Sequence, residues 1–448
     1  MIIVCIGDSL TEGDYGIKGV RGVANVQSDN YPYFLSLMSG AEVRNYGKCG
    51  IRASGFLKLY DEGKVDVKGA DAIFVMLGTN GGQSASEDTY DNRCYEELIV
   101  KLMKDAPQAK LVLIVPPQGT VNPEYSNCGY MPQIIEAQKF TRMMAEKYSL
   151  ALLDAGKDKH FSPENEYVMQ PEDGLHLGFM GYARLADMVN GAVKPLRKSP
   201  LSTVKMLPDA GKTKLVAHRG LSGLECENTA AAFIAAGNRA YYGIETDIWR
   251  TNDGKFICSH DGRTHRLCDT DINIEESSFD EVRALRLKDT DGKTVRGYYG
   301  YPTPEEYVDI CKKYSKHCVP ELKSDFTEDE IRQIIDIFAS RDYLDNTTFI
   351  AFNPENLELV KKVRPEQNCQ LLVGWGAMPE NWLDDILPYL EEHKFGIDAD
   401  YFVINPDTAA RLHAHGIEIN VWTVDNPALA KKLIESGVDM ITTNILEY

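Results

Sequence analysis

Short apolar runs alternate with amphipathic segments along the first half of the sequence. The apolar runs have the length of buried strands, and the segments between them repeat apolar residues at helical spacing. The expected strands are 2–6, 43–47, 72–77, 110–115 and 150–155, and the expected helices are 91–105, 133–148 and 178–193. This alternation predicts an α/β fold with a parallel sheet covered by helices on both faces, with ligands at the carboxyl ends of the strands.

The same alternation continues in the second half, where nine strand-like runs occur. These runs are 214–220, 243–249, 255–261, 318–323, 347–352, 370–375, 401–405, 417–424 and 439–444. A closed barrel of eight parallel strands takes about 250 residues, which fits this half. Because only a few residues separate 255–261 from the strand before it, this run is expected to form an antiparallel hairpin. The second half is therefore predicted to be a TIM (β/α)8 barrel.

A basic, proline-containing stretch separates the two halves. Residues 194–214 carry six basic side chains, one acid and three prolines. A chain of 448 residues exceeds one ordinary hydrophobic core. The expected organisation is a domain at 1–193, a linker at 194–213 and a domain at 214–448. Basic side chains in a linker are usually solvated, and the alternative is that they guide anionic intermediates between the halves.

The formal net charge of −19 restricts the classes of binding partner that we expect. Such a field repels nucleic-acid backbones and anionic lipid surfaces, so we expect small-molecule substrates and no nucleic-acid partner. No basic region precedes the first apolar run, and no apolar stretch approaches the roughly 20 residues of a membrane-spanning helix. We therefore expect a cytoplasmic protein without stable membrane insertion. The ten cysteines include no C-x-x-C pair and are expected to be reduced thiols.

A serine-hydrolase arrangement is spread across the first half. "IGDSLTEG" places Ser9 directly after the first expected strand, where an open sheet presents its site. "EDGLHLG" places Asp173 three residues before His176, a spacing that lets the carboxylate orient the imidazole so that it takes a proton from Ser9. Gly50 follows the second strand and Asn80 the third. A backbone N–H and a side-chain amide are the donors of an oxyanion hole.

These blocks resemble those of the GDSL, or SGNH, hydrolase family over about residues 1–193. The resemblance implies a flavodoxin-like, three-layer α/β/α domain. The roles that it implies are a nucleophile at Ser9, a triad completed by Asp173 and His176, and an oxyanion hole at Gly50 and Asn80. Gly81 is a departure, because the family often has Asp at that position. This difference bears on the geometry of the loop after Asn80 and therefore on the subfamily to which the domain is assigned. The alternative is a flavodoxin-like domain without catalysis.

Acidic residues on expected barrel strands mark the second half. In "GIETDIW", Glu245 and Asp247 are two residues apart and therefore share the inner face of one strand. "PELK" repeats this pattern with Glu321 and Lys323. Three buried carboxylates against one lysine leave excess negative charge. We therefore infer a divalent metal with oxygen ligands, Ca²⁺ or Mg²⁺.

Two histidines and an arginine accompany this cluster. "VAHRG" places His218 and Arg219 where the first barrel strand ends, and "CSHDG" brings His260 near the carboxylates. Two histidines beside a metal-bound anion supply the acid and the base that cleavage of a phosphodiester needs. Arg219 and Lys323 supply positive charge for the phosphate.

The order of these motifs resembles the glycerophosphodiester phosphodiesterase family over about 214–448. The roles that the resemblance implies are metal binding by Glu245, Asp247 and Glu321, acid–base catalysis by His218 and His260, and phosphate binding by Arg219 and Lys323. In the family's mechanism, the glycerol 2-hydroxyl attacks its own phosphorus and water opens the cyclic phosphate. Cys226, Ala351 and Asn444 differ from the residues that are common in the family at these positions. These differences are expected to mark a subfamily with an altered leaving-group pocket. Trp422 either walls that pocket or is a buried barrel tryptophan.

The two halves together suggest consecutive cleavages. We expect the first to remove an acyl group from a lipid or glycan ester, and the second to cut the resulting glycerophosphodiester to glycerol 3-phosphate and an alcohol. An alternative is a carbohydrate O-acetylesterase fused to a phosphodiesterase that trims glycerophosphate from a glycan. In a further alternative, one domain is a non-catalytic binding module.

Overall fold

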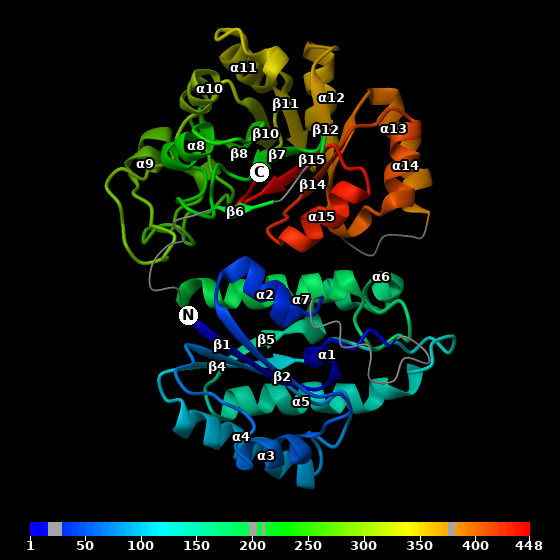
Figure 1. Cartoon of the computed structure of the whole chain (residues 1–448). Coiled ribbons are helices and arrows are strands. Elements are labelled where there is room, and N and C mark those ends of the chain that lie inside the picture. Colours follow the sequence, from blue (N-terminus) through cyan, green and yellow to red (C-terminus); the bar gives the residue numbers. More distant parts are fainter. Residues whose placement is uncertain (17–28, 197–203, 208–210, 375–380) are drawn as a thin grey trace. The chain divides into compact units, whose positions relative to one another are not determined.

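The computed structural model describes residues 1–16, 29–196, 204–207, 211–374 and 381–448. The chain divides into two compact units, Met1–Arg197 and Lys198–Tyr448 (Figure 1). Within the expected linker, 197–203 and 208–210 lie outside the described residues. No helix in the described part of the chain is both long and apolar enough to cross a membrane. All ten cysteines are free, as expected.

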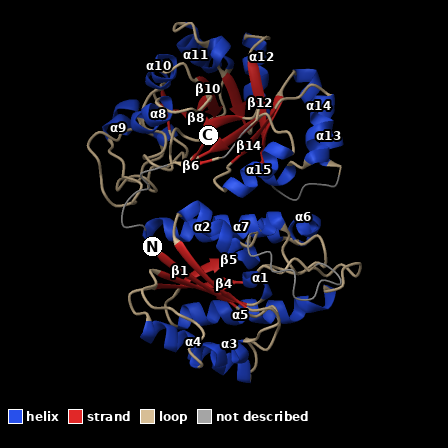
Figure 2. Ribbon diagram, in the orientation of Figure 1, coloured by secondary structure: helices blue, strands red, loops and turns tan. Residues whose placement is uncertain are grey.

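The first unit is a parallel sheet between two layers of helices. Its strands are β1 (Ile2–Gly7), β2 (Glu42–Gly47), β3 (Ala72–Met76), β4 (Lys110–Val115) and β5 (Ala151–Asp154). Its α-helices are α1 (Ser9–Glu12), α2 (Tyr31–Ser39), α3 (Ala53–Asp61), α4 (Tyr90–Asp105), α5 (Met131–Lys147), α6 (Glu166–Met169) and α7 (Phe179–Val193). Helices α2 and α7 cover one face of the sheet, and α3, α4 and α5 cover the other (Figure 2). The predicted three-layer α/β/α fold is confirmed.

The strand order of this sheet is β2-β1-β3-β4-β5, so the order reverses beside β1. The apolar run of β1 forms this centre because Val4 and Ile6 are fully buried in the core between the sheet and the helices. On the helical side, Tyr95 and Leu98 of α4 join the same core. Thr89 fixes the start of α4 by accepting a hydrogen bond from Asn92 N at 3.0 Å.

The second unit is a closed barrel of parallel strands. Its strands are β7 (Lys214–Ala217), β8 (Gly243–Arg250), β10 (His317–Leu322), β11 (Thr348–Ala351), β12 (Asn368–Val373), β13 (Gly396–Asp400), β14 (Ile419–Trp422) and β15 (Met440–Thr443). Pairing of β15 with β7 and of β8 with β10 closes the barrel. The TIM-barrel prediction is confirmed. The predicted hairpin is also present, because β9 (Phe256–Cys258) pairs antiparallel with β8.

Helices surround this barrel. They are α8 (Ala230–Gly237), α9 (Phe279–Ala284), α10 (Pro304–Lys313), α11 (Glu328–Ala339), α12 (Pro354–Val363), α13 (Trp382–His393), α14 (Pro406–Ala414) and α15 (Pro427–Glu435). A short piece of the stretch predicted as linker also belongs to this unit. Strand β6 (Lys205–Met206) pairs in parallel with β16 (Leu446–Glu447), so these residues hold the end of the chain.

The expected strand at 401–405 is wrong. The strand at this point of the barrel is β13, and Tyr401–Val403 form a single 3-10 turn after it. Asp400 caps this turn by accepting a hydrogen bond from Phe402 N at 3.2 Å. Strand β13 does not read as an apolar run because its five residues include two acids, Asp398 and Asp400. The apolar residues that follow, 401–404, are buried, but they lie in the 3-10 turn and directly after it and not in a strand.

Candidate active sites

Ser9 lies where the strand order of the first unit reverses. It is the first residue of α1, directly beyond β1. Asp8 caps this short helix by accepting a hydrogen bond from Leu10 N at 3.1 Å. Asp8 is fully buried and also accepts a hydrogen bond from Thr79 Oγ1. Because open α/β sheets bind ligands where the strand order reverses, Ser9 is well placed to meet a substrate.

The structure brings His176 and Asp173 to Ser9. His176 Nε2 lies 3.0 Å from Ser9 Oγ, and His176 Nδ1 lies 2.7 Å from Asp173 Oδ2. Asp173 is itself fixed, because its Oδ1 accepts from the amide of Leu175 at 3.0 Å and its Oδ2 accepts from Asn127 Nδ2 at 2.7 Å. In this geometry a serine hydroxyl can pass its proton to an imidazole that a carboxylate orients.

Burial and charge act in opposite directions on His176. Burial lowers the pKa of His176, but the hydrogen bond and charge of Asp173 outweigh it and raise this pKa above 6.5. Asp14 adds to the raised pKa, because its Oδ2 lies 3.7 Å from His176 Nε2. No sequence motif marks Asp14, so this contact was not predictable from the sequence.

Gly50 and Asn80 line a pocket together with Arg52, Tyr130 and Gln133. Gly50 has a φ of 72°, a left-handed conformation that favours glycine. Asn80 Nδ2 donates a hydrogen bond to the carbonyl of Ile51 at 3.1 Å. No hydrogen bond among the described residues joins Gly50 or Asn80 to Ser9, so their role as oxyanion donors stays a prediction.

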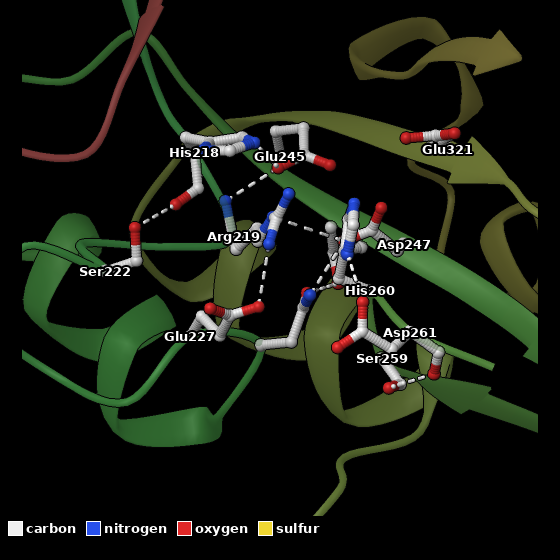
Figure 3. A network of polar contacts seen from close by, with 12 residues as sticks. His218, Arg219, Ser222, Glu227, Glu245, Asp247, Ser259, His260, Asp261 and Glu321 are labelled. Carbon is white, nitrogen blue, oxygen red and sulfur yellow. Dashed lines mark hydrogen bonds and ion pairs between the residues drawn. The ribbon is translucent and has the colours of Figure 1, made fainter. Parts of the chain in front are cut away.

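The second site lies inside the barrel, at the carboxyl ends of its strands (Figure 3). Glu245 and Asp247 come from β8, and Glu321 comes from the adjacent β10. Each offers an oxygen within 4.8 Å of the others. Asp247 Oδ1 is buried without a hydrogen-bond partner among the described residues, although Lys323 Nζ lies 3.5 Å away. This set of carboxylate oxygens fits a hard divalent cation.

The electrostatics of these carboxylates favour a cation. Burial, followed by the charge of Asp247, raises the pKa of Glu245 well above its ordinary value and that of Glu321 to about 7. Burial also opposes ionisation of Asp247, but the charges of Arg219 and Lys323 outweigh it and lower the pKa of this residue. Without a cation, the cluster therefore retains protons that bound metal would displace.

Both predicted histidines line this barrel site. His218 Nδ1 lies 2.8 Å from Asn444 Oδ1, and His260 Nδ1 lies 2.8 Å from Asp261 Oδ1. Burial, then the charge of Arg219, lowers the pKa of His218 to about 4. The same two causes lower the pKa of His260. His218 is therefore neutral near pH 7 in the empty site, and the Nε2 of each imidazole is left to act on a substrate.

Arg219 and Lys323 also reach the site, but both are already paired with carboxylates. Arg219 Nη1 lies 2.8 Å from Glu227 Oε1, and its backbone N–H donates to Glu245 Oε2 at 2.6 Å. Lys323 Nζ lies 2.9 Å from Glu321 Oε1. A substrate phosphate would therefore share these cations with protein carboxylates.

Several residues outside the predicted catalytic, phosphate-binding and metal-binding set support this site. Asn228 Nδ2 donates to Asp247 Oδ2 at 2.7 Å, and Asn228 lies in the sequence Glu227-Asn228-Thr229 directly before α8. Asn444, which departs from the family's usual residue, contacts His218 from the end of the last barrel strand. Of the two alternatives for Trp422, the structure shows a residue that lines the barrel cavity, and its Nε1 donates to the carbonyl of Asp398 at 3.0 Å.

Comparison with protein families separates the two units in the same way. Residues 5–184 match the model of the GDSL-like Lipase/Acylhydrolase family. Residues 218–447 match the model of the Glycerophosphoryl diester phosphodiesterase family. Both resemblances expected from the sequence are confirmed, and both families are hydrolases.

Curated proteins similar to this chain match its second unit. A glycerophosphodiester phosphodiesterase of Caldanaerobacter subterraneus is 27% identical over 235 residues, which is 52% of this chain and 94% of that protein. Glycerophosphodiester phosphodiesterase 1 of Rattus norvegicus is 33% identical over 283 residues, 54% of this chain and 82% of that protein. Among solved structures, an Oleispira antarctica phosphodiesterase in complex with the product sn-glycerol-3-phosphate matches with a TM-score of 0.45 and 25% identity, over 53% of this chain and 93% of its own.

Proposed function

The chain belongs to the glycerophosphoryl diester phosphodiesterase family, and from this membership we propose that it is a bifunctional hydrolase with one active site in each unit. The second unit hydrolyses glycerophosphodiesters to glycerol 3-phosphate and an alcohol, and it requires a divalent metal. The first unit hydrolyses carboxylic esters of lipids or glycans through Ser9. The observation that carries the proposal is the contact of His176 with both Ser9 and Asp173 in a chain whose barrel gathers its own acidic cluster.

In the phosphodiesterase reaction, the hydrogen bonds of the two histidines assign their roles. His218 Nδ1–H donates to Asn444 Oδ1, so its Nε2 carries a lone pair and takes the proton of the attacking glycerol 2-hydroxyl. His260 Nδ1 faces the carboxylate of Asp261, which favours the imidazolium form, and the negative charge of a bound phosphodiester favours it further. In this protonated form His260 gives its Nε2 proton to the departing alcohol oxygen. Water then opens the cyclic phosphate with the proton transfers reversed.

Glu245, Asp247 and Glu321 would hold the divalent metal. When bound, a Ca²⁺ or Mg²⁺ ion supplies positive charge that polarises the phosphate. Arg219 and Lys323 then orient the phosphate. The proximity of an intramolecular hydroxyl to phosphorus lowers the barrier further, since such reactions have very large effective molarities.

Removal of the metal is expected to abolish phosphodiesterase activity and to leave ester hydrolysis unchanged.

Glu321→Gln removes one of the three proposed metal ligands. Loss of a residue that only hydrogen-bonds a metal ligand lowers metal affinity by roughly 10- to 100-fold. Loss of the ligand Glu321 itself is therefore expected to weaken metal binding by more than this. The measurement is the melting temperature of the full chain against Mg²⁺ or Ca²⁺ concentration, since an ion at 100 times its Kd stabilises by about 2.7 kcal/mol. The exposed Glu435→Gln is the matched control. Equal metal-induced stabilisation of Glu321→Gln and wild type would contradict the site.

In the ester hydrolysis, Ser9 Oγ attacks the carbonyl carbon while His176 Nε2 takes its proton. The negative oxygen of the tetrahedral intermediate accepts hydrogen bonds from the Gly50 N–H and the Asn80 amide. His176 then returns the proton to the leaving alcohol, and water hydrolyses the acyl-Ser9 ester by the same route. Asp173 holds the imidazole in the tautomer that this transfer needs.

Ester hydrolysis is expected to rise with pH through a pKa above 6.5, because His176 must be neutral to accept a proton and Asp173 raises its pKa. Asp173→Asn is expected to lower kcat about 10⁴-fold, as loss of the orienting carboxylate does in other triads, and to shift this pKa downward. Asp14→Asn removes a charge 3.7 Å away but no hydrogen bond to His176, so a smaller downward shift and a smaller loss are expected. The measurement is kcat/KM against pH, and an unchanged pKa in Asp173→Asn would contradict the assignment.

The pocket beside the oxyanion donors bears on the ester substrate. Its lining includes Arg52, Ser126, Tyr130 and Gln133, which offer hydrogen bonds and a positive charge. Such a lining favours a small acyl group on a polar or anionic alcohol. The same lining is consistent with the second candidate function, a carbohydrate O-acetylesterase fused to the phosphodiesterase. Hydrolysis of sugar O-acetyl esters without hydrolysis of acylated glycerophosphodiesters would favour that second candidate.

A further inference from the structure

One arginine of the first unit has no carboxylate partner. An aspartate or glutamate pairs with each of the other described arginines of this unit, Arg44, Arg93, Arg142 and Arg184. Arg52 is exposed and forms no ion pair with any described residue, although the chain has a formal net charge of −19. A guanidinium group that no carboxylate neutralises in so acidic a protein is available to an anion from outside the chain.

The guanidinium group of Arg52 is anchored at one of its three nitrogens. Arg52 Nε donates to the carbonyl of Asn80 at 2.9 Å, and Asn80 Nδ2 donates to the carbonyl of Ile51 at 3.1 Å. These two hydrogen bonds join the loop after β2 to the loop after β3. Nη1 and Nη2 have no acceptor among the described residues. Arg52 therefore offers two neighbouring nitrogens, which can donate to two oxygens of a phosphate or carboxylate at once.

The pocket that Arg52 lines suits a small anionic ligand. Its volume is about 410 Å³, which lies within the range of pockets that hold small molecules. No described residue of its lining is acidic, and its uncharged polar residues include Ser126, Tyr130 and Gln133. Arg52 is thus the single charged group of the described lining, and it favours a ligand of negative charge.

The anion that Arg52 binds is expected to be part of the ester substrate. The predicted oxyanion donors Gly50 and Asn80 line the same pocket, so the reacting carbonyl and the anion would occupy it together. A phosphodiester group carries one negative charge and two non-bridging oxygens, which match the two free nitrogens of Arg52. The proposed substrates of the second unit are glycerophosphodiesters, and an acyl ester of such a molecule combines both groups.

We propose that Arg52 binds the phosphodiester group of the ester substrate, so that the first unit hydrolyses acyl esters of glycerophosphodiesters in preference to neutral esters. This inference rests on the proposed function of the first unit, ester hydrolysis at Ser9. Nη1 and Nη2 of Arg52 donate to the two non-bridging oxygens of the phosphodiester. Each unit then recognises the same charged group, the second with Arg219 and Lys323 and the first with Arg52.

The test measures butanoate release by the full chain from three esters, with a chelator present to silence the second unit. They are the methyl phosphodiester of 1-butanoylglycerol, the neutral 1-butanoylglycerol, and 3-butanoylglycerate, which carries a carboxylate. Wild type is expected to prefer the phosphodiester to the neutral ester by about 10- to 100-fold in kcat/KM, the effect of hydrogen bonds to a charged group. The glycerate ester is expected to be cleaved less well than the phosphodiester, because its carboxylate lies nearer to the ester group.

Arg52→Gln removes the charge but keeps a side-chain N–H for the carbonyl of Asn80, and it is expected to lose the preference for the phosphodiester. Arg52→Lys keeps the charge but loses the paired nitrogens, so an intermediate preference is expected. Arg93→Gln is the matched control, because Arg93 is an exposed arginine of α4 that pairs with Asp88 at 2.8 Å and does not line the pocket. It is expected to keep the wild-type preference. Because the esters are assayed on one preparation, loss of folded protein cancels in the ratio of kcat/KM values.

Each outcome of this test decides the inference. Equal cleavage of the phosphodiester and neutral esters by wild type, or an undiminished preference in Arg52→Gln, overturns it and leaves the proposed ester hydrolysis standing. Loss of the preference in Arg93→Gln, or better cleavage of the glycerate ester than of the phosphodiester, also overturns it. Release of no butanoate by wild type overturns the proposed ester hydrolysis, and the inference with it. If Arg52→Gln does not fold, salt decides, because the wild-type preference must decline as added salt screens the charges, and a salt-independent preference overturns the inference.

Discussion

Replacing His218 with alanine is expected to lower kcat/KM for glycerophosphocholine by about 10²- to 10⁴-fold, the usual contribution of a general base. The variant removes the Nε2 that takes the proton of the attacking hydroxyl group, while the carboxylates of β8 and β10 stay in place. Hydrolysis of a chromogenic short-chain ester is expected to be unchanged, because the first unit has a histidine of its own. The measurement is kcat/KM for both substrates on one preparation.

His317→Asn is the matched control for His218→Ala. His317 is a second histidine of the barrel whose pKa is lowered to about 4, chiefly by burial. It stands at the first residue of β10, the end remote from the site, and its Nε2 lies 2.9 Å from Thr348 Oγ1. Phosphodiesterase activity is expected to survive in this control. Similar losses in both variants would indicate damage to the barrel and would contradict a special role for His218.

Replacing Ser9 with alanine is expected to lower ester hydrolysis by roughly 10⁴- to 10⁶-fold, the scale seen when a triad loses its nucleophile. The reason is that no acyl intermediate can form, although His176 and Asp173 keep their contact. Glycerophosphocholine hydrolysis is expected to be unchanged. The assay is release of a chromogenic alcohol from a short-chain ester.

Ser39→Ala is the matched control for Ser9→Ala. Ser39 is also a buried serine of the first unit, but its Oγ donates only to the carbonyl of Leu35 at 2.6 Å on α2. Ester hydrolysis is expected to persist in this variant. Wild-type ester hydrolysis in Ser9→Ala would show that another residue is the nucleophile.

The parts of both sites that could be predicted from the sequence depend on local geometry. Asp173 and His176 are three residues apart, so their contact needs only one loop. Glu245 and Asp247 share a face because side chains alternate along a strand. Glu321 was predictable because the same alternation acts on a second strand and buried carboxylates imply a cation.

The parts that could not be predicted depend on closure of the fold. Asn444 meets His218 across 226 residues because the last barrel strand pairs with the first. Asp14 reaches His176 across the first unit, and neither residue type nor spacing signals this contact. Strand β13 was placed wrongly because it carries two acids where an apolar run was expected. Polar residues that line a cavity, as Asp398 does, break the hydrophobic pattern by which their strands are identified.

The proposed mechanism of the barrel explains why the two proposed reactions form a sequence. The glycerol 2-hydroxyl that attacks phosphorus must be free, so an acyl group at that position has to be removed first. A serine hydrolase on the same chain supplies that substrate at a high effective concentration, provided that both act on one class of molecule. The order of the two steps is then set by chemistry and not by the linker.

The central claim is that one chain performs both cleavages in this order, and product analysis with a short-chain 1,2-diacyl-glycerophosphocholine, whose 2-hydroxyl is blocked, tests it most directly. In the presence of Mg²⁺ or Ca²⁺, wild type is predicted to release the carboxylic acid, glycerol 3-phosphate and choline. His218→Ala is predicted to stop at glycerophosphocholine, and Ser9→Ala to leave the substrate intact. Release of choline from the acylated substrate by Ser9→Ala, or an intact substrate after incubation with wild type, would contradict the claim.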